Sequence, residues 1–272
     1  MYLKLLPALK QLACDAGDVI MHIYRDQTHW NTQQKSNDTP VTAADLAAHK
    51  LLVQGLQQLS PGIPILSEEA DIPDWQHRQH WSCYWLLDPL DGTREFLQRN
   101  GEFTVNIALI EAGRVQLGLV YAPDSETLYW GSKETGAWKS QRSAPGTAIH
   151  TRRSDDKLTL LTSRRHSQNE SAAIGQLLPA NSTHLITTQC LGSSLKLCRI
   201  AEGQADLYLR LSPTSEWDTA AGQAILEAAG GELLQLPELA PLQYNSKASL
   251  ENPGFIASGQ KRHDWRSLTL PD

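Results

Sequence analysis

Apolar residues recur every three or four positions in two stretches near the start of the chain, at residues 5–23 and 42–59. Because this spacing gathers apolar side chains on one face of a helix, both stretches are predicted to form amphipathic helices. Short apolar runs at residues 63–66 and 84–87 predict strands, and carboxylates follow each of them. Both strands therefore end on acidic residues.

Alternation of apolar and other residues follows in the middle of the chain. It covers residues 103–109 and 115–121 on either side of an Ala-Gly pair, which predicts a β-hairpin. Residues 127–130 and 137–139 predict two further short strands. The first half of the chain thus opens with helices and continues as a run of strands.

The polar stretch at residues 139–156 shows no periodicity, and we place a domain boundary there. Beyond it, strand-like and helix-like runs alternate, which is typical of an α/β layer structure. The strand-like runs are residues 158–161, 184–188 and 205–211, and the helix-like runs are residues 193–202 and 218–229. We therefore expect an α+β domain at residues 1–150 and an α/β domain at residues 151–272.

Composition narrows the possible partners. A net charge of -6 gives no basic surface of the kind that follows a nucleic-acid backbone, so no nucleic-acid polymer is expected. No apolar run approaches the roughly 20 residues of a transmembrane helix, which predicts a cytoplasmic protein. Lys4 and Lys10 are too few to predict a membrane anchor, and they leave open a peripheral position on the inner face of the membrane. The oligomeric state stays open.

Two carboxylates flank Pro89 and Leu90 directly after the second predicted strand. Because proline fixes a backbone turn, Asp88 and Asp91 are expected to converge at the strand end. Converging negative charges repel one another in a partly buried site, and a divalent cation bound by oxygen is the usual compensation. Magnesium fits better than zinc, because no His or Cys is paired with these acids.

Gly92 and Thr93 are predicted to open a short helix next to these carboxylates. The free N–H groups and the dipole of a helix start favour an anion, so a phosphate would fit beside the metal. A second interpretation stays open, in which Asp88 and Asp91 are turn residues and Thr93 is a helix cap.

Three other acidic segments favour the same chemistry, and each also has a structural interpretation. Glu68 and Glu69 follow a predicted strand, but a Glu pair also suits a solvated turn. Asp45 belongs to a capping box, and Asp218 suits the N-cap of a helix. Taken singly, none of these segments identifies a metal site.

Three of these motifs occur together, in the same order as in a known family. An acidic pair lies at residues 68–69, Asp-Pro-Leu-Asp-Gly-Thr at 88–93, and Trp-Asp-Thr-Ala-Ala-Gly at 217–222. In this the chain resembles the inositol monophosphatase superfamily of metal-dependent, lithium-sensitive phosphatases over nearly its whole length. The resemblance implies a layered αβαβα sandwich of the sugar-phosphatase type, with an α+β N-terminal half and an α/β C-terminal half.

The resemblance also implies roles for individual residues. The magnesium ligands it implies are Glu68, Asp88, Asp91, Asp218 and the carbonyl oxygen of Leu90. Asp45 and Thr93 resemble the family pair that orients and deprotonates the attacking water, with Glu68 assisting from the metal. The choice of Glu68 over Glu69 depends on a register of one residue.

The substrate is implied by other segments. Residues 192–196, Gly-Ser-Ser-Leu-Lys, resemble a signature of the 3′(2′),5′-bisphosphate nucleotidases within the superfamily, and residues 163–166 and 207–210 resemble companion segments. A helix start carrying two serines, with basic residues nearby, suits a second phosphate. On the local sequence alone, an ordinary helix cap and a surface arginine are equally good interpretations. The implied substrate contacts are Glu68, Leu90, Asp91, Gly92, Thr93, His166, Ser193, Ser194, Lys196, Arg210 and Asp218.

The expected activity is hydrolysis of adenosine 3′,5′-bisphosphate to AMP and phosphate, which clears a by-product of sulfate assimilation. The sulfated nucleotide is a further possible substrate. An inositol monophosphatase is the alternative within the same class. A sensor that only binds phosphorylated nucleotides is the alternative in another class, and the retained acids and the Thr93 hydroxyl argue against it.

Overall fold

A sheet of seven strands forms the centre of the N-terminal half. The computed structural model describes residues 2–26, 28, 30–34, 40–142, 144–153, 157–164 and 185–259. The sheet has its strands in chain order: β3 (Ile65–Ser67), β4 (Cys83–Asp91), β5 (Thr104–Glu111), β6 (Arg114–Ala122), β7 (Thr127–Ser132), β8 (Gly136–Gln141) and β9 (Thr147–Ile149). β3 and β4 pair in parallel, and every later pair is antiparallel.

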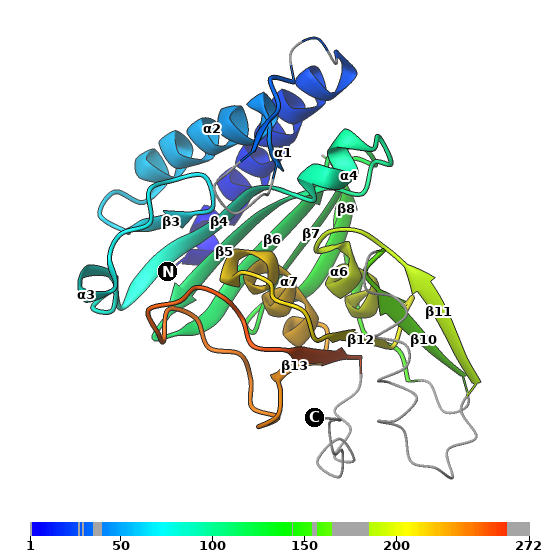
Figure 1. Cartoon of the computed structure of the whole chain (residues 1–272). Coiled ribbons are helices and arrows are strands. Elements are labelled where there is room, and N and C mark those ends of the chain that lie inside the picture. The colour runs from blue at the N-terminus through cyan, green and yellow to red at the C-terminus, as the bar shows by residue number, and fades with distance from the viewer. Residues whose placement is uncertain are drawn as a thin grey trace.

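Two long helices cover one face of this sheet (Figure 1). A short 3₁₀ helix, η1 (Tyr2–Leu5), leads into α1 (Leu6–Arg25), and α2 (Ala43–Leu59) packs beside it. Their apolar faces pack with strand residues such as Trp85 in one buried cluster. Both amphipathic helices expected from the sequence are therefore confirmed. The small strands β1 (Gln33–Gln34) and β2 (Pro40–Val41) lie between α1 and α2 in the sequence and pair with each other in antiparallel fashion.

A second sheet of five strands lies on the other side of the molecule. Its order is β11 (Leu185–Cys190), β10 (Lys157–Thr162), β12 (Leu207–Arg210), β14 (Phe255–Ser258) and β13 (Glu232–Gln235). β10 runs parallel to both of its neighbours, whereas β14 is antiparallel to both of its own.

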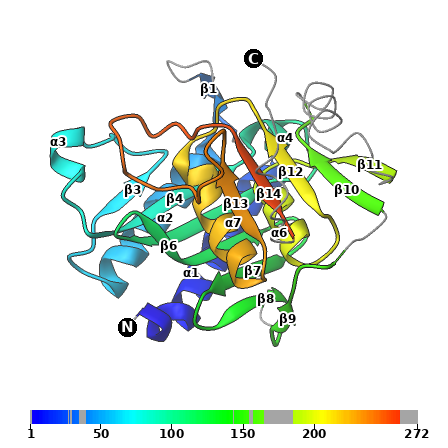
Figure 2. The same ribbon diagram turned by 90° about the horizontal axis from the view of Figure 1, so that it is seen from below.

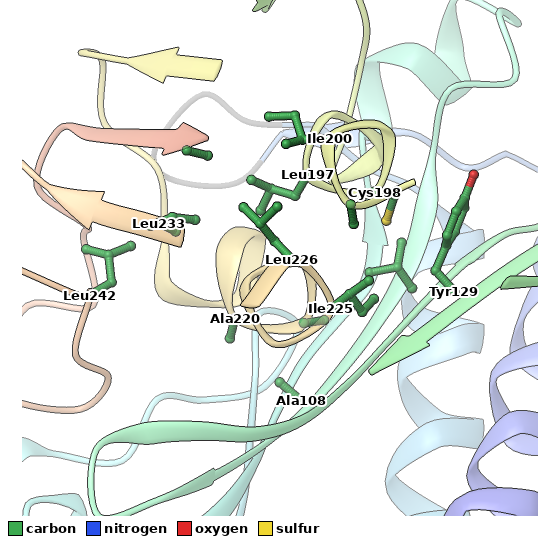
Figure 3. Close-up of a cluster of buried hydrophobic side chains, with 14 of the residues drawn as sticks. Ala108, Tyr129, Leu197, Cys198, Ile200, Ala220, Ile225, Leu226, Leu233 and Leu242 are labelled. Carbon is green, nitrogen blue, oxygen red and sulfur yellow. The ribbon is translucent and has the colours of Figure 1, made fainter. Parts of the chain in front are cut away.

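Helices α6 (Leu195–Ala201) and α7 (Glu216–Ala228) fill the space between the two sheets. Figure 3 shows their apolar side chains packed between Ala108 and Tyr129 of the first sheet and Leu233 of the second. In Figure 2, α7 lies between β6 and β7 on one side and β13 on the other. The described residues therefore form helix, sheet, helix and sheet layers, and the last helical layer of the predicted sandwich stays a prediction.

Two strand glycines let α7 approach the first sheet closely. A Cβ atom on Gly118 would lie 2.2 Å from the carbonyl oxygen of Ala221, and one on Gly131 would lie 2.9 Å from the Cα of Ile225. Any larger side chain at either position would push the helix away. This contact fixes the start of α7, and with it Asp218, over the end of β4.

Several boundaries differ from the sequence-based expectation. The carboxylates of residues 88–91 do not follow β4 on a turn but form its last residues, with an irregular register opposite β5. The polar stretch at residues 139–156 contains β9, which pairs with β8 and forms the edge strand of the sheet. The strands β13 and β14 and the short helix α3 (Trp75–Arg78) were not predicted. None of these segments is long or periodic enough to stand out.

The division of the chain at residue 150 stays a prediction. The first sheet ends at Ile149 and the second begins at Lys157. However, one buried cluster joins Leu86 and Ala108 of the first sheet to Leu226 and Leu233 beyond the boundary.

No helix in the described ranges combines the length and the apolar character needed to cross a membrane.

Candidate active site

Three carboxylates from separate elements meet at the end of β4. Glu68 follows β3, Asp88 lies within β4, and Asp218 lies in the first turn of α7. One oxygen from each lies within 4.8 Å of the others. Because β3 and β4 are parallel neighbours, their carboxyl ends meet at the same edge. Of the acidic pair, Glu68 is the member that joins this group.

Asp88 is buried with only one of its oxygens satisfied. Its side chain is 1% exposed, and Oδ1 accepts a hydrogen bond from the N–H of Leu90 at 3.1 Å. Oδ2 is buried and has no hydrogen-bond partner among the described residues. Burial, followed by the nearby Glu68 and Asp91, raises the pKa of Asp88 well above its usual range. A buried, all-oxygen group of this kind fits a hard divalent cation.

Asp218 caps the helix that carries it. Its Oδ2 accepts from the N–H of Ser215 at 2.8 Å, which completes a capping box. Burial, followed by Asp91, raises the pKa of Asp218 well above its usual range. The capping interpretation and the metal interpretation are therefore compatible, since the cap engages one oxygen and leaves the other.

Asp91 is held by the loop before α6. Its Oδ2 accepts from Ser193 Oγ at 2.7 Å, from the N–H of Ser194 at 2.6 Å and from Ser194 Oγ at 2.8 Å. Ser193 adopts a φ of 55°, in the left-handed region that non-glycine residues rarely use. The phosphate contacts of Ser193 and Ser194 stay a prediction, because in this structure both hydroxyls face Asp91.

Two buried residues of β5, not foreseen from the sequence, support this loop. Thr104 Oγ1 lies 2.6 Å from Ser193 Oγ and donates to Asn106 Oδ1 at 2.9 Å. Asn106 Nδ2 donates to Ser194 Oγ at 2.8 Å. These side chains lie opposite Asp91 and Asp88 in the sheet. The available signal was their polarity at alternate positions of an otherwise apolar strand.

Thr93 and Asp45 form a hydrogen-bonded pair beside the three carboxylates. Gly92, with a φ of 90°, begins the short helix α4 (Thr93–Leu97) as expected. Thr93 Oγ1 donates to Asp45 Oδ1 at 3.0 Å. Asp45 Oδ2 accepts from the N–H and the hydroxyl of Thr42 at 2.7 and 2.6 Å. Burial raises the pKa of Asp45 despite these hydrogen bonds.

Two adjoining cavities open at this edge. The first, which we call the carboxylate cavity, has a volume of about 440 Å³ and contains Glu68, Asp88 and Leu90 in its wall. The second, which we call the basic cavity, has a volume of about 460 Å³. Its cationic lining residues are Arg94, Arg164, Lys196 and Arg210. The two cavities share a wall formed by Asp91, Gly92, Arg94, Glu95, Thr214 and Asp218.

The remaining predicted contacts have distinct surroundings. Lys196 is buried, and its Nζ donates to the carbonyl oxygens of Leu191 at 3.1 Å and Ser193 at 2.8 Å. Arg210 Nε donates to the carbonyl oxygen of Ser212 at 3.1 Å. His166 lies outside the described residues.

Comparison with known proteins agrees with this architecture. A model of the inositol monophosphatase family matches residues 2–268. The 3′(2′),5′-bisphosphate nucleotidase CysQ of Salmonella typhimurium is 49% identical over 90% of this chain and 96% of that protein. The protein of the same name from Escherichia coli K12 is 47% identical over 91% of this chain and 97% of its own length.

Solved structures agree as well. The crystal structure of CysQ from Bacteroides thetaiotaomicron has a TM-score of 0.80 and 36% identity, and the match covers 92% of this chain and 95% of that chain. The family model spans nearly the whole sequence, and both sheets lie within the matched region. On these grounds the chain belongs to the inositol monophosphatase family.

Proposed function

We propose that this protein is a magnesium-dependent 3′(2′),5′-bisphosphate nucleotidase that hydrolyses adenosine 3′,5′-bisphosphate to AMP and inorganic phosphate. The observation that carries the proposal is the pair of adjoining cavities, one built around carboxylates and the other around cations. This arrangement provides one place for the phosphate that reacts and another for the phosphate that stays. The names of the bacterial relatives support the same substrate class.

In this proposal, the metal is held by Glu68, Asp88, Asp91, Asp218 and the carbonyl oxygen of Leu90. The orphaned Oδ2 of Asp88 and the absence of nitrogen and sulfur donors from this set favour magnesium. Bound magnesium would compensate the charge of the phosphate and lower the pKa of a water molecule.

Thr93 and Asp45 would then orient the attacking water and accept its proton. Because the Thr93 hydroxyl donates a hydrogen bond to Asp45, its lone pairs can accept a hydrogen bond from that water. The buried Asp45 is the acceptor at the end of this path, and its hydrogen bonds from Thr42 fix its orientation. We propose that the N–H groups of Gly92 and Thr93, where α4 begins, bind the phosphate oxygens.

The inositol monophosphatase alternative needs only one phosphate position. The inositol monophosphatase structure from Anabaena has a TM-score of 0.71 and 26% identity, so this alternative is worth a direct test. It leaves the basic cavity without a role, which is why we favour the nucleotide.

The test is phosphate release from adenosine 3′,5′-bisphosphate, its 5′-phosphosulfate analogue and inositol 1-phosphate, with magnesium, EDTA or lithium. We expect magnesium-dependent, lithium-inhibited release that is fastest with a nucleotide, and Lys196→Ala and Arg210→Ala should lower the nucleotide rate selectively. A dominant rate on inositol phosphate would contradict the nucleotide assignment. Nucleotide binding without any turnover would instead favour the sensor.

A further inference from the structure

Arg94 occupies the wall between the two cavities. It is the residue after Thr93 on α4 and is partly exposed. Among the described residues, Arg94 is the one cation that lines the carboxylate cavity, and it also lines the basic cavity. The acids around the carboxylate cavity are Glu68, Asp88, Asp91, Glu95, Asp218 and Glu251.

The other cations of the basic cavity have protein partners. Arg164 forms a two-point ion pair with Glu102, and the N–H of Gly192 donates to the same carboxylate at 2.7 Å. Lys196 and Arg210 donate to backbone carbonyl oxygens, as described above. In contrast, the Arg94 guanidinium makes no hydrogen bond or ion pair within the part of the chain that the structure describes.

This contrast matters because an arginine surrounded by acids usually pairs with one of them. The Arg94 guanidinium is therefore available at the boundary between the two cavities, which a bound bisphosphate would span. Its planar fork can donate two parallel hydrogen bonds to one phosphate group. In the proposed function the metal would bind the reacting phosphate, whereas the second phosphate needs a cation of its own.

We propose that Arg94 binds the phosphate that is not cleaved and thereby selects bisphosphorylated nucleotides over monophosphorylated ones. The inference rests on the proposed nucleotidase function and adds a residue that the signature segments at 192–196 and 207–210 do not include. In this arrangement Arg94 also separates the negative charge of the retained phosphate from the carboxylates on the shared wall.

The experiment compares two substrates that carry the same reacting phosphate. Adenosine 3′,5′-bisphosphate has the retained 5′-phosphate, and adenosine 3′-phosphate lacks it. For Arg94→Met we expect kcat/KM on the bisphosphate to fall about 10- to 100-fold, the range for losing a hydrogen bond between charged groups, while kcat/KM on the monophosphate changes less than about threefold. Arg94→Lys should be intermediate, because it keeps the charge without the fork.

The matched control is Arg114→Met, which removes the same charge from an exposed position that lines neither cavity. It should behave as wild type on both substrates. Equal losses on both substrates in Arg94→Met, or no loss on either, would overturn the inference. Thermal unfolding of each variant shows whether the fold is intact.

A binding measurement separates this inference from the proposed function. AMP retains only the 5′-phosphate, so calorimetry should show an AMP dissociation constant about 10- to 100-fold higher in Arg94→Met than in wild type, without any turnover. An unchanged constant would overturn the role of Arg94 even in an active enzyme. A wild-type protein that binds AMP but hydrolyses neither substrate would overturn the nucleotidase function alone.

Discussion

Replacing Asp88 by asparagine should stabilise the metal-free protein, although the residue is buried. The amide has nearly the same volume as the carboxylate, and its oxygen can still accept the hydrogen bond from Leu90 N–H. Its NH₂ group can donate toward Glu68 and Asp218, where Asp88 Oδ2 had no donor. The substitution therefore removes repulsion without leaving a cavity.

The size of the effect follows from the carboxylate separations. At 4.8 Å and an effective dielectric constant of about 20, two unit charges repel by about 3.5 kcal/mol. Asp88 has two such neighbours, and proton uptake relieves part of this repulsion because the pKa of Asp88 is raised. We therefore expect a gain of roughly 2–4 kcal/mol in EDTA near neutral pH, which corresponds to a rise of about 5–10 °C in Tm.

The assay is thermal unfolding in EDTA and in excess magnesium. Magnesium at about 100 times its Kd should stabilise the wild type by about 2.7 kcal/mol and the Asp88→Asn variant much less. Asp206→Asn is the control, because Asp206 accepts two hydrogen bonds from Arg152 and one from the Thr159 N–H. Losing its charge should lower Tm in both conditions.

Two results would refute this reasoning. A lower Tm for Asp88→Asn in EDTA would show that the carboxylates do not repel one another in the folded protein. An unchanged stabilisation by magnesium would show that Asp88 is not required for binding the ion.

The polar networks around the site give three more predictions. Asp45→Asn should lower kcat by about 10²- to 10⁴-fold while keeping the magnesium-dependent rise in Tm, and kcat within threefold of wild type would exclude Asp45 as the base. Asn106→Ala should lower kcat about tenfold, and adding Ser194→Ala should cost little more, because both act on one carboxylate; independent, multiplicative losses would contradict the shared network. Burial raises the pKa of Glu216 to about 7 from 4.5, so this group makes stability fall as pH rises through that window. Glu216→Gln should flatten the pH dependence of Tm there, and an unchanged slope between pH 5 and pH 7 would contradict the shift.

Much of the fold was predictable because apolar residues recur with a clear period within its long helices and strands. The two N-terminal helices and the β5–β6 hairpin follow from periodicity alone. Short strands such as β13 and β14, of four residues each, carry too few positions for a pattern. They form because β14 pairs with β12 and β13, contacts between residues far apart in the sequence.

The acids of the site could be named from their motifs, but their hydrogen-bonding partners could not. Glu68, Asp88 and Asp218 lie within 4.8 Å of one another, as their motifs suggested. In contrast, the hydroxyls of Ser193 and Ser194 suggested a phosphate site, and only the structure shows that they hold Asp91. A serine donates equally well to a phosphate or a carboxylate, so only three-dimensional placement decides between them.

The serine donors of Asp91 also bear on when the enzyme becomes active during synthesis. Ser193 lies 102 residues after Asp91 in the chain, and Asp218 follows later still. When the ribosome has completed the first sheet, Glu68 and Asp88 are present without either partner, and loop closure over such distances delays folding. Under the proposed function, the metal site is complete only once α7 has been made and has packed against β6 and β7, so we expect a chain truncated before Asp218 to have no phosphatase activity.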